Sequence, residues 1–211
     1  MNPRRRRAAL ILDRLAAQHP DARIALHFST PLELLVATIL SAQCTDARVN
    51  MVTPALFARC PTAADYLAMP AAELEEMIRP TGFFRNKARA IQEACAAIVA
   101  RHGGEVPATL DELVALHGVG RKTAAVVSSN AFGRRDGIAV DTHVRRVSQR
   151  LGFTEHEDPD KIEQDLMRVI PKRQWFAFTY VLIDHGRTVC VARTPRCAEC
   201  PVSDLCPSSL V

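Results

Sequence analysis

The sequence lacks any long hydrophobic run. No stretch of its 211 residues approaches the roughly 20 consecutive apolar residues that a membrane-spanning helix needs. Arg4–Arg7 are followed by apolar residues, as in a signal peptide, but charge returns at Asp13 and Arg14. The apolar segment between them is too short for an export signal. These absences predict a cytoplasmic protein that does not contact a membrane.

Strand patterns are also nearly absent. The alternation of apolar and polar residues that marks a half-buried strand is missing, and only the residues "GIAV" (137–140) look extended. There are no internal repeats and no low-complexity linker. With 48% hydrophobic and 24% charged residues, the composition is that of an ordinary globular protein. The predicted fold class is all-α.

Helical signals fill most of the chain. Thr30-Pro31 marks a helix start, because proline is favoured at the first helical position. Thr109 with Glu112 three residues later predicts a capping box. A glycine pair closes a long amphipathic helix over residues 86–102. Further helices are expected at residues 121–132, 141–150, 159–170 and 174–184.

Lysine is scarce, although the chain is mildly basic. Of the 27 lysines and arginines only four are lysines, and the formal net charge is +4. Such a charge is compatible with a polyanionic partner but does not require one. Since arginine supplies most of the positive charge, Lys122 beside Arg121 is a candidate for a specific role.

Cysteine is present in an odd number, seven, which argues against a disulfide framework. Four of the seven form the pattern C-x6-C-x2-C-x5-C near the end of the chain, and these are Cys190, Cys197, Cys200 and Cys206. Four thiolates in a short loop are typical of a metal site, and spacing alone leaves zinc and an iron–sulfur cluster open. The other three are expected to be buried small hydrophobic residues: Cys44, Cys60 and Cys95.

The stretch "LHGVGRKTAAV" (116–126) contains a turn made by Gly118, Val119 and Gly120. Glycine permits a left-handed backbone and lets backbone N–H groups approach a ligand closely. Because the next helix begins at about Arg121, its free N–H groups and positive dipole end face the turn. This combination favours binding of a nucleic-acid phosphate. The alternative is an αα-hairpin turn that binds nothing.

Several separated motifs occur in order along the chain. "LHGVGRKTA" is similar to the helix-hairpin-helix of base-excision DNA glycosylases, with His117 where that family usually has proline. "VDTHVRRV" (140–147) is similar to the segment that carries the superfamily's catalytic aspartate. Together with "SAQCTD" (41–46), "GEVP" (104–107) and the terminal cysteines, these motifs make nearly the whole chain resemble the endonuclease III family.

The resemblance implies two helical domains with the active cleft between them. Residues 24–134 would form a six-helix barrel containing the helix-hairpin-helix, and residues 1–23 and 135–211 an iron–sulfur cluster domain. The four terminal cysteines would hold a [4Fe–4S] cluster. The expected partner is double-stranded DNA containing damaged bases or abasic sites. The protein would act as a monomer in a prokaryotic cytoplasm, associated with the nucleoid.

The resemblance also assigns catalytic roles. Lys122 lies at the position of the family's catalytic lysine, whose amine attacks the sugar C1′ and leaves a Schiff base that promotes β-elimination. Asp141 is the candidate catalytic carboxylate. Asp is also a preferred N-cap, so capping of the following helix is an alternative role for Asp141, and the two roles are compatible.

The resemblance also implies contacts with DNA. Gln43 would occupy the space left by a flipped-out base, and Phe83 would insert as an apolar wedge, whereas Phe84 is expected to pack in the core. Phosphate contacts are expected from the turn and from the cluster loop, at Gly118, Val119, Gly120, Arg121, Thr123, Arg193 and Arg196. Arg193 and Arg196 are equally interpretable as solvated loop residues. Arg4–Arg7 are expected to form a frayed, solvated helix end with non-specific DNA affinity.

The resemblance thus implies a bifunctional enzyme of base excision repair, a glycosylase for oxidised pyrimidines and an abasic-site lyase. One alternative is an adenine-type monofunctional glycosylase, which usually lacks this lysine and carries a further C-terminal domain. Here Lys122 is present, and five residues follow Cys206. The other alternative is a noncatalytic helix-hairpin-helix protein that binds DNA or senses redox state.

Overall fold

The computed structural model describes residues 3–211. Over that range the chain is helical, with short 3-10 turns and no strand, which confirms the all-α prediction. The "GIAV" segment is irregular. No helix among these residues is long and apolar enough to cross a membrane.

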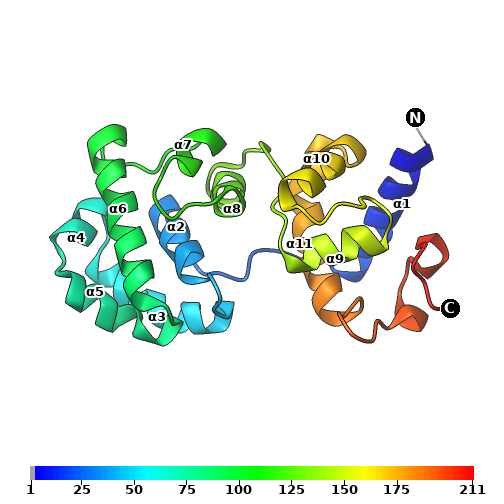
Figure 1. The fold of residues 1–211 in the computed structure, drawn as a ribbon, viewed down its shortest axis with the longest axis horizontal. Coiled ribbons are helices and arrows are strands. Elements are labelled where there is room, and N and C mark those ends of the chain that lie inside the picture. The colour runs from blue at the N-terminus through cyan, green and yellow to red at the C-terminus, as the bar shows by residue number, and fades with distance from the viewer. Residues whose placement is uncertain (1–2) are drawn as a thin grey trace. The chain divides into compact units, whose positions relative to one another are not determined.

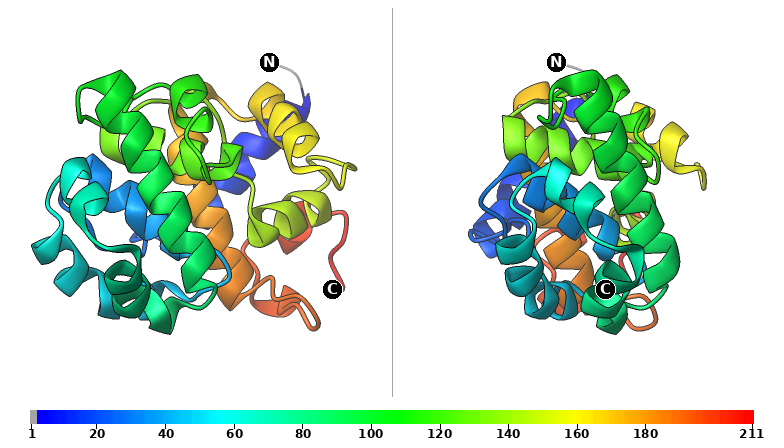
Figure 2. Two further views of the ribbon diagram at one scale, coloured as in Figure 1. Left: turned by 60° about the vertical axis from the view of Figure 1, so that its left-hand side comes forward. Right: turned by 90° about the vertical axis from the view of Figure 1, so that its left-hand side faces the viewer.

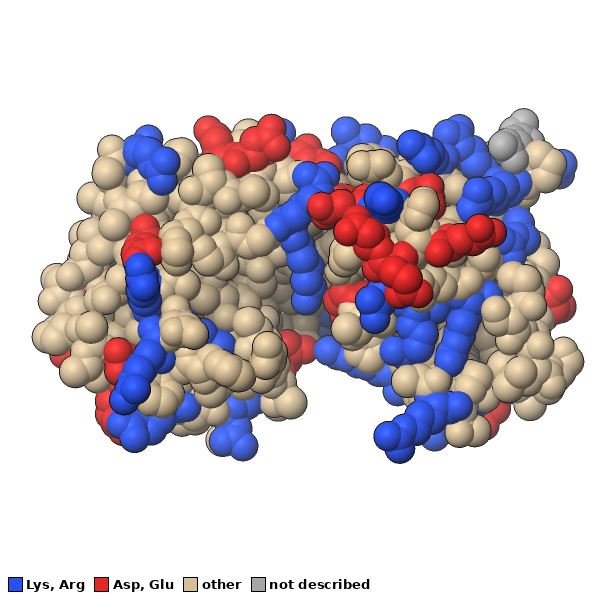
Figure 3. All heavy atoms as spheres, viewed as in Figure 1, with Lys and Arg blue, Asp and Glu red and all other residues tan. Residues whose placement is uncertain are grey.

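The chain divides into two compact units, and one of them is discontinuous in sequence. It combines the N-terminal residues up to Ile24 with Gly137–Val211, while Ala25–Asp136 form the other. The discontinuous unit contains 16 basic and 12 acidic residues, against 11 of each in the other. The net positive charge therefore belongs to the discontinuous unit, and basic side chains are dense over it on the face drawn in Figure 3.

The continuous unit is built around a helix that is apolar on all sides. Its helices are α2 (Pro31–Leu40), α3 (Asp46–Arg59), α4 (Ala63–Ala68), α5 (Ala71–Ile78), α6 (Phe84–His102), α7 (Leu110–Val114) and α8 (Arg121–Phe132). Every residue of α2 from Leu34 to Leu40 is buried, as expected of a helix without a polar face. It packs against α3, α6 and α8, while α6 packs on α4 and α5 (Figure 1 and Figure 2).

The discontinuous unit brings both ends of the chain into one core. It contains α1 (Pro3–Gln18), α9 (Thr142–Arg150), α10 (Pro159–Val169) and α11 (Trp175–Thr188). Figure 1 shows α1 with α10 and α11. Its buried apolar side chains come from both segments and include Ile11, Leu15, Val144, Phe153, Leu166, Phe178 and Leu182. Burial of this shared surface is what joins the N-terminal helix to the C-terminal half.

The arginines at the start of α1 correct the expectation of a frayed end. Arg4 donates to the carbonyl of Phe153 at 2.6 Å, and Arg7 donates to the carbonyl of Leu151 at 2.8 Å. Arg5 donates to the carbonyl of Arg168 at 2.9 Å. Carbonyls beyond a helix end have no intrahelical partner and accept such bonds readily. These arginines therefore fasten α1 to the ends of α9 and α10.

The capping box at the N-terminus of α2 is expected to contribute to the stability of the fold. The Thr30 hydroxyl accepts from the N–H of Glu33 at 3.2 Å, and the Glu33 carboxylate accepts from the N–H of Thr30 at 3.3 Å. We expect Thr30→Ala to lower the free energy of unfolding by about 1 kcal/mol, measured by urea denaturation. Thr30→Ser keeps the hydroxyl and should stay near wild type. Equal losses in both variants would contradict the capping role.

Candidate active site and metal centre

The turn between α7 and α8 depends on Gly118. Its φ is +73°, and a Cβ placed there would lie 2.6 Å from the Cβ of Ala90 on α6. Gly120 has φ −77° as N-cap of α8, and nothing lies within 4 Å of a Cβ added to it. Gly118 is therefore required by close packing and by its left-handed backbone, whereas the space at Gly120 is open for a ligand.

Some residues around the two glycines are buried and anchor the turn, whereas others are exposed. Val119 is buried, and its N–H donates to the carbonyl of Leu116 at 3.2 Å, so Val119 anchors the turn. Arg121 and Lys122 are exposed in the first turn of α8, and Thr123 is half-buried. The Lys122 amine thus projects from a helix N-terminus directly after the turn.

Asp141 is the N-cap of α9. Its Oδ1 accepts from the N–H of His143 at 2.9 Å and from the N–H of Val144 at 2.7 Å. The capping role expected from its residue type is therefore present in the structure. These two bonds fix the orientation of the carboxylate. Asp141 belongs to the discontinuous unit and Lys122 to the continuous one.

Gln43 and Phe83 share an unusual backbone conformation. Between residues 3 and 211 they are the non-glycine residues with positive φ, at 53° and 48°. A left-handed non-glycine residue costs on the order of 1–3 kcal/mol. Gln43 is exposed, and Phe83 is 63% exposed. The structure therefore maintains two strained turns, each of which presents one side chain to the surroundings.

Phe84 differs from the expectation of core packing. Its side chain is half-buried, and the guanidinium groups of Arg79 and Arg85 lie 5.3 and 5.7 Å from the centre of its ring. Cation–π contacts of this kind hold an aromatic ring at the surface. Phe84 therefore packs under two arginines at the start of α6.

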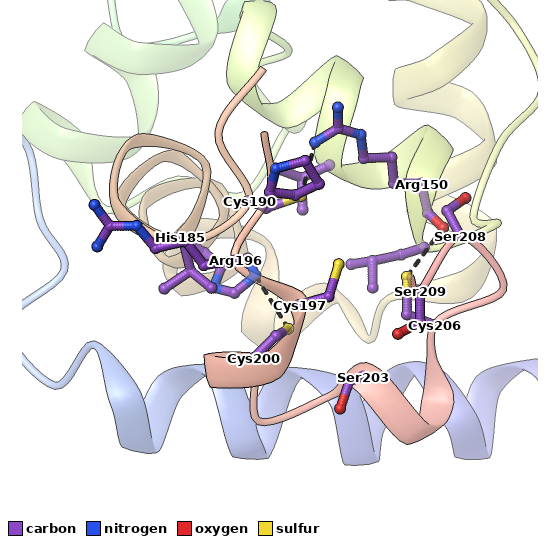
Figure 4. A pocket seen from close by; sticks show the side chains of 14 residues that line it. Arg150, His185, Cys190, Arg196, Cys197, Cys200, Ser203, Cys206, Ser208 and Ser209 are labelled. Carbon is purple, nitrogen blue, oxygen red and sulfur yellow. Dashed lines mark hydrogen bonds between the residues drawn. The ribbon is translucent and has the colours of Figure 1, made fainter. Parts of the chain in front are cut away.

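The four terminal cysteines surround one cavity. They are half-buried and line a space of about 30 Å³ between α9, α11 and the final loop (Figure 4). Burial raises the pKa of the Cys200 and Cys206 thiols, and a bound metal reverses that effect because it stabilises thiolates. Over residues 3–211 no three Cys, His, Asp or Glu side chains converge on a point that one metal ion could occupy.

Arginines hold the cluster loop, which runs from Cys190 to Cys206. Arg150 lies 3.4 Å from the sulfur of Cys190 and donates to the carbonyls of Val191 and Ala192 at 2.8 and 2.7 Å. Arg146, one turn earlier on α9, donates to the carbonyl of Cys190 at 3.2 Å. From α1, arginines donate to the carbonyls of Leu205 and Pro201. The sequence analysis missed these roles; the spacing of 146 and 150, four residues apart on one helix face, was the available signal.

His185 on α11 is a further residue that the sequence analysis missed. It is 1% exposed, and its Nε2 lies 3.7 Å from the Cys200 sulfur (Figure 4). Its Nδ1 lies 3.4 Å from Nε2 of His19. Burial, with the neighbouring His19, lowers the pKa of His185 to about 4. A neutral imidazole has one N–H, and a thiolate only accepts. The hydrogen therefore lies on Nε2 when Cys200 is a thiolate, and Nδ1 accepts from His19.

The remaining predicted residues are placed as follows. Arg193 and Arg196 are exposed, and Nη1 of Arg196 lies 4.0 Å from Oε2 of Glu199. Cys60 and Cys95 are buried as expected, and burial raises the pKa of Cys95 to about 12. Cys44 is half-buried instead, since it lies in the turn that contains Gln43.

The chain contains two features that define its class. One is a helical hairpin with a glycine turn and a lysine at the N-terminus of its second helix, and the other is a loop with four cysteines. Together they define a helix-hairpin-helix protein with a metal centre. Residues 36–172 match the HhH-GPD superfamily of base excision DNA repair proteins, and residues 190–206 match the iron–sulfur binding domain of endonuclease III. The second match decides between the two metals that spacing left open. The centre is a [4Fe–4S] cluster, and the four sulfurs around one cavity fit it.

Individual relatives agree with the family matches. Endonuclease III of Synechocystis sp. is 54% identical over 99% of this chain and 95% of its own length. Two solved structures, a non-covalent endonuclease III–DNA complex and a trapped endonuclease III–DNA covalent intermediate, have TM-scores of 0.91 and 0.92. Both are 48% identical to this chain and cover 97% of it and 96% of their own chains. The chain therefore belongs to the endonuclease III family within the HhH-GPD superfamily.

The contrast between the two turn glycines gives a matched pair of variants. We expect Gly118→Ala to lower the free energy of unfolding by about 2–4 kcal/mol, from its left-handed backbone and from overpacking against Ala90. Gly120→Ala meets open space, and we expect a loss below about 1 kcal/mol. Thermal unfolding of both variants is the measurement. A loss at Gly120→Ala as large as at Gly118→Ala would contradict this account of the turn.

The contacts of Arg150 predict that it retains the cluster. Arg150→Met keeps the length of the side chain but removes the bonds to the loop. We expect cluster loss to a chelator to become about tenfold faster, followed by visible absorbance and iron content. Arg168→Met is the control, since that side chain is exposed and pairs with Asp165 on its own helix. Identical rates in the two variants would refute the role of Arg150.

Proposed function

We propose that this protein removes oxidised pyrimidines from duplex DNA and cleaves the resulting abasic site by β-elimination. The observation that carries the proposal is the exposed lysine at the N-terminus of α8, directly after the glycine turn. Support comes from a structural neighbour described as a covalent intermediate between endonuclease III and DNA, because such an intermediate needs a nucleophile on the protein.

Lys122 is the proposed nucleophile. Its amine forms a bond to C1′ of the damaged nucleotide while the bond from C1′ to the base nitrogen breaks, and the base leaves with that electron pair. Loss of a proton from nitrogen and ring opening give a protonated Schiff base. This iminium acidifies the C2′–H bond, so removal of that proton expels the 3′-phosphate. The exposed position of Lys122 leaves its amine accessible to a sugar.

Asp141 is the proposed catalytic carboxylate. Its Oδ1 is engaged by two backbone N–H groups of α9, which fix where the negative charge lies. A carboxylate fixed in this way stabilises a positively charged sugar without reorganisation during the reaction. It also provides an acceptor for a proton.

Binding of the DNA is assigned to the turn and to the two strained loops. The N–H groups at the start of α8, with Arg121 and Thr123, would hold a backbone phosphate. Flipping a base out of the duplex costs a few kcal/mol, and side chains that fill the vacated space offset that cost. Gln43 and Phe83 are proposed for this role because both are exposed on constrained backbone.

The discontinuous unit is proposed to contribute the cluster and the positive charge. Cys190, Cys197, Cys200 and Cys206 would hold the cluster, which would supply a link among them and a capacity for electron transfer, and no step of base removal is assigned to it. The excess of basic residues in this unit favours a polyanion, and Arg193 and Arg196 would add phosphate contacts. We further propose that the protein acts as a monomer on chromosomal DNA in the bacterial cytoplasm.

Borohydride trapping tests the proposed reaction. On a duplex with one thymine glycol, wild type should give a covalent protein–DNA band, because borohydride reduces the Schiff base. Lys122→Ala should give no band while still binding the duplex. Lys161→Ala, which removes an exposed lysine on α10, should trap as wild type does.

Asp141→Asn separates the carboxylate's charge from its capping role, since asparagine is an equally good N-cap. We expect this variant to fold normally and to release base about a hundredfold more slowly, measured in single-turnover assays.

If wild type released base without a trapped band, an adenine-type monofunctional reaction would replace the proposal. Binding with neither product would favour the noncatalytic DNA-binding protein.

A further inference from the structure

Lys87 is a buried lysine that the proposed mechanism does not use. It lies in the first turn of α6 and is 5% exposed. Its Nζ donates to the carbonyl of Leu40 and to the carbonyl of Thr81, each at 2.8 Å. Burial lowers the pKa of Lys87, and the nearby Cys44 opposes that shift. Burying an amine is unfavourable unless it is hydrogen-bonded, so these carbonyl contacts account for its position.

The two carbonyls belong to the two strained loops. Leu40 ends α2, three residues before Gln43, and Thr81 ends a 3-10 turn (Arg79–Thr81), two residues before Phe83. The backbone N–H of Lys87 also donates to the carbonyl of Phe83 at 3.1 Å. Lys87 therefore contacts the base of one loop once and the base of the other loop twice.

Few other side chains could make these contacts. The amine has several donors on a long flexible stem, so it reaches two carbonyls that are separated by 41 residues in sequence. Leu40 also ends a buried helix, where the carbonyl end carries partial negative charge that favours a cation. Methionine has a similar length but donates no hydrogen bond.

We propose that Lys87 is a positioning residue that fixes the Gln43 loop and the Phe83 loop relative to each other, so that both side chains enter damaged DNA as a pair. The inference rests on the proposed function, and specifically on insertion by these two residues. Lys87 itself is too deeply buried to touch DNA. Its two hydrogen bonds hold the loops of Gln43 and Phe83 in place before DNA binds. The loss of conformational entropy when the two side chains insert is therefore smaller.

Lys87→Met tests the role on substrates that differ in their need for insertion. On a thymine glycol duplex with 2-aminopurine beside the lesion, we expect base flipping and base release to fall by about tenfold to a hundredfold. On a single-stranded abasic oligonucleotide, which has no partner strand to fill, borohydride trapping should stay near wild type. Lys161→Met, which changes an exposed lysine in the other unit, should match wild type on both.

A double-mutant cycle at Gln43 and Phe83 tests the pairing, first in the otherwise wild-type protein and then in the Lys87→Met background. Gln43→Ala and Phe83→Ala should each slow base release from the duplex, and their effects should be non-additive in the otherwise wild-type protein. In the Lys87→Met background the two effects should become additive. If Lys87→Met does not fold, additive effects in the otherwise wild-type protein would by themselves overturn the proposal.

The remaining outcomes separate this inference from the proposed function. If Lys87→Met lost activity equally on duplex and single-stranded substrates, the residue would have a general structural role and the inference would be overturned. Wild-type rates for Lys87→Met on both substrates would overturn it as well. If wild type itself neither released base nor trapped on any substrate, the proposed function would fail instead.

Discussion

Cationic side chains that donate to main-chain carbonyls connect the parts of this structure. An all-helical chain leaves carbonyls without partners at every helix end, and those that are buried must be satisfied. Here arginine and lysine side chains satisfy several of them across long sequence distances. Arg4 and Arg7 bind carbonyls after α9, Arg150 binds the cluster loop, and Lys87 binds the ends of two loops.

This use of positive charge changes how the basic composition is interpreted. A net charge of +4 suggests a surface prepared for a polyanion, yet many of the arginines make internal contacts. Arg7, Arg146 and Arg150 are engaged with carbonyls of their own unit. Arginine suits this task because its planar group presents several donors at fixed angles. The long-range field still favours DNA, but much of the side-chain chemistry stabilises the loops that the proposed function uses.

Many of the helices and the turn of the candidate site were predictable from the sequence because they have local signatures, whereas α3, α4 and α5 were not predicted. Thr30 and Asp141 were recognisable as caps, and the glycine turn was recognisable from its spacing. The contacts of Arg150, His185 and Lys87 were not predictable, since a bond from a side chain to a distant carbonyl leaves no periodic pattern. The same holds for the left-handed backbone at Gln43 and Phe83. Neither residue type demands that conformation, which is imposed by the surrounding loops.

The discontinuous unit depends on packing between the two ends of the chain. Its core requires α1 from the beginning of the chain and α11 from near the end, so it forms only after the continuous unit has been synthesised. The cluster loop depends on the same closure, because Arg7 and Arg14 of α1 bind its carbonyls. Metal binding stabilises thiolates that burial alone disfavours, as at Cys200 and Cys206, and so couples to folding. A bound cluster would therefore stabilise the packing of α1 in this unit, because the loop that holds the cluster is hydrogen-bonded to that helix.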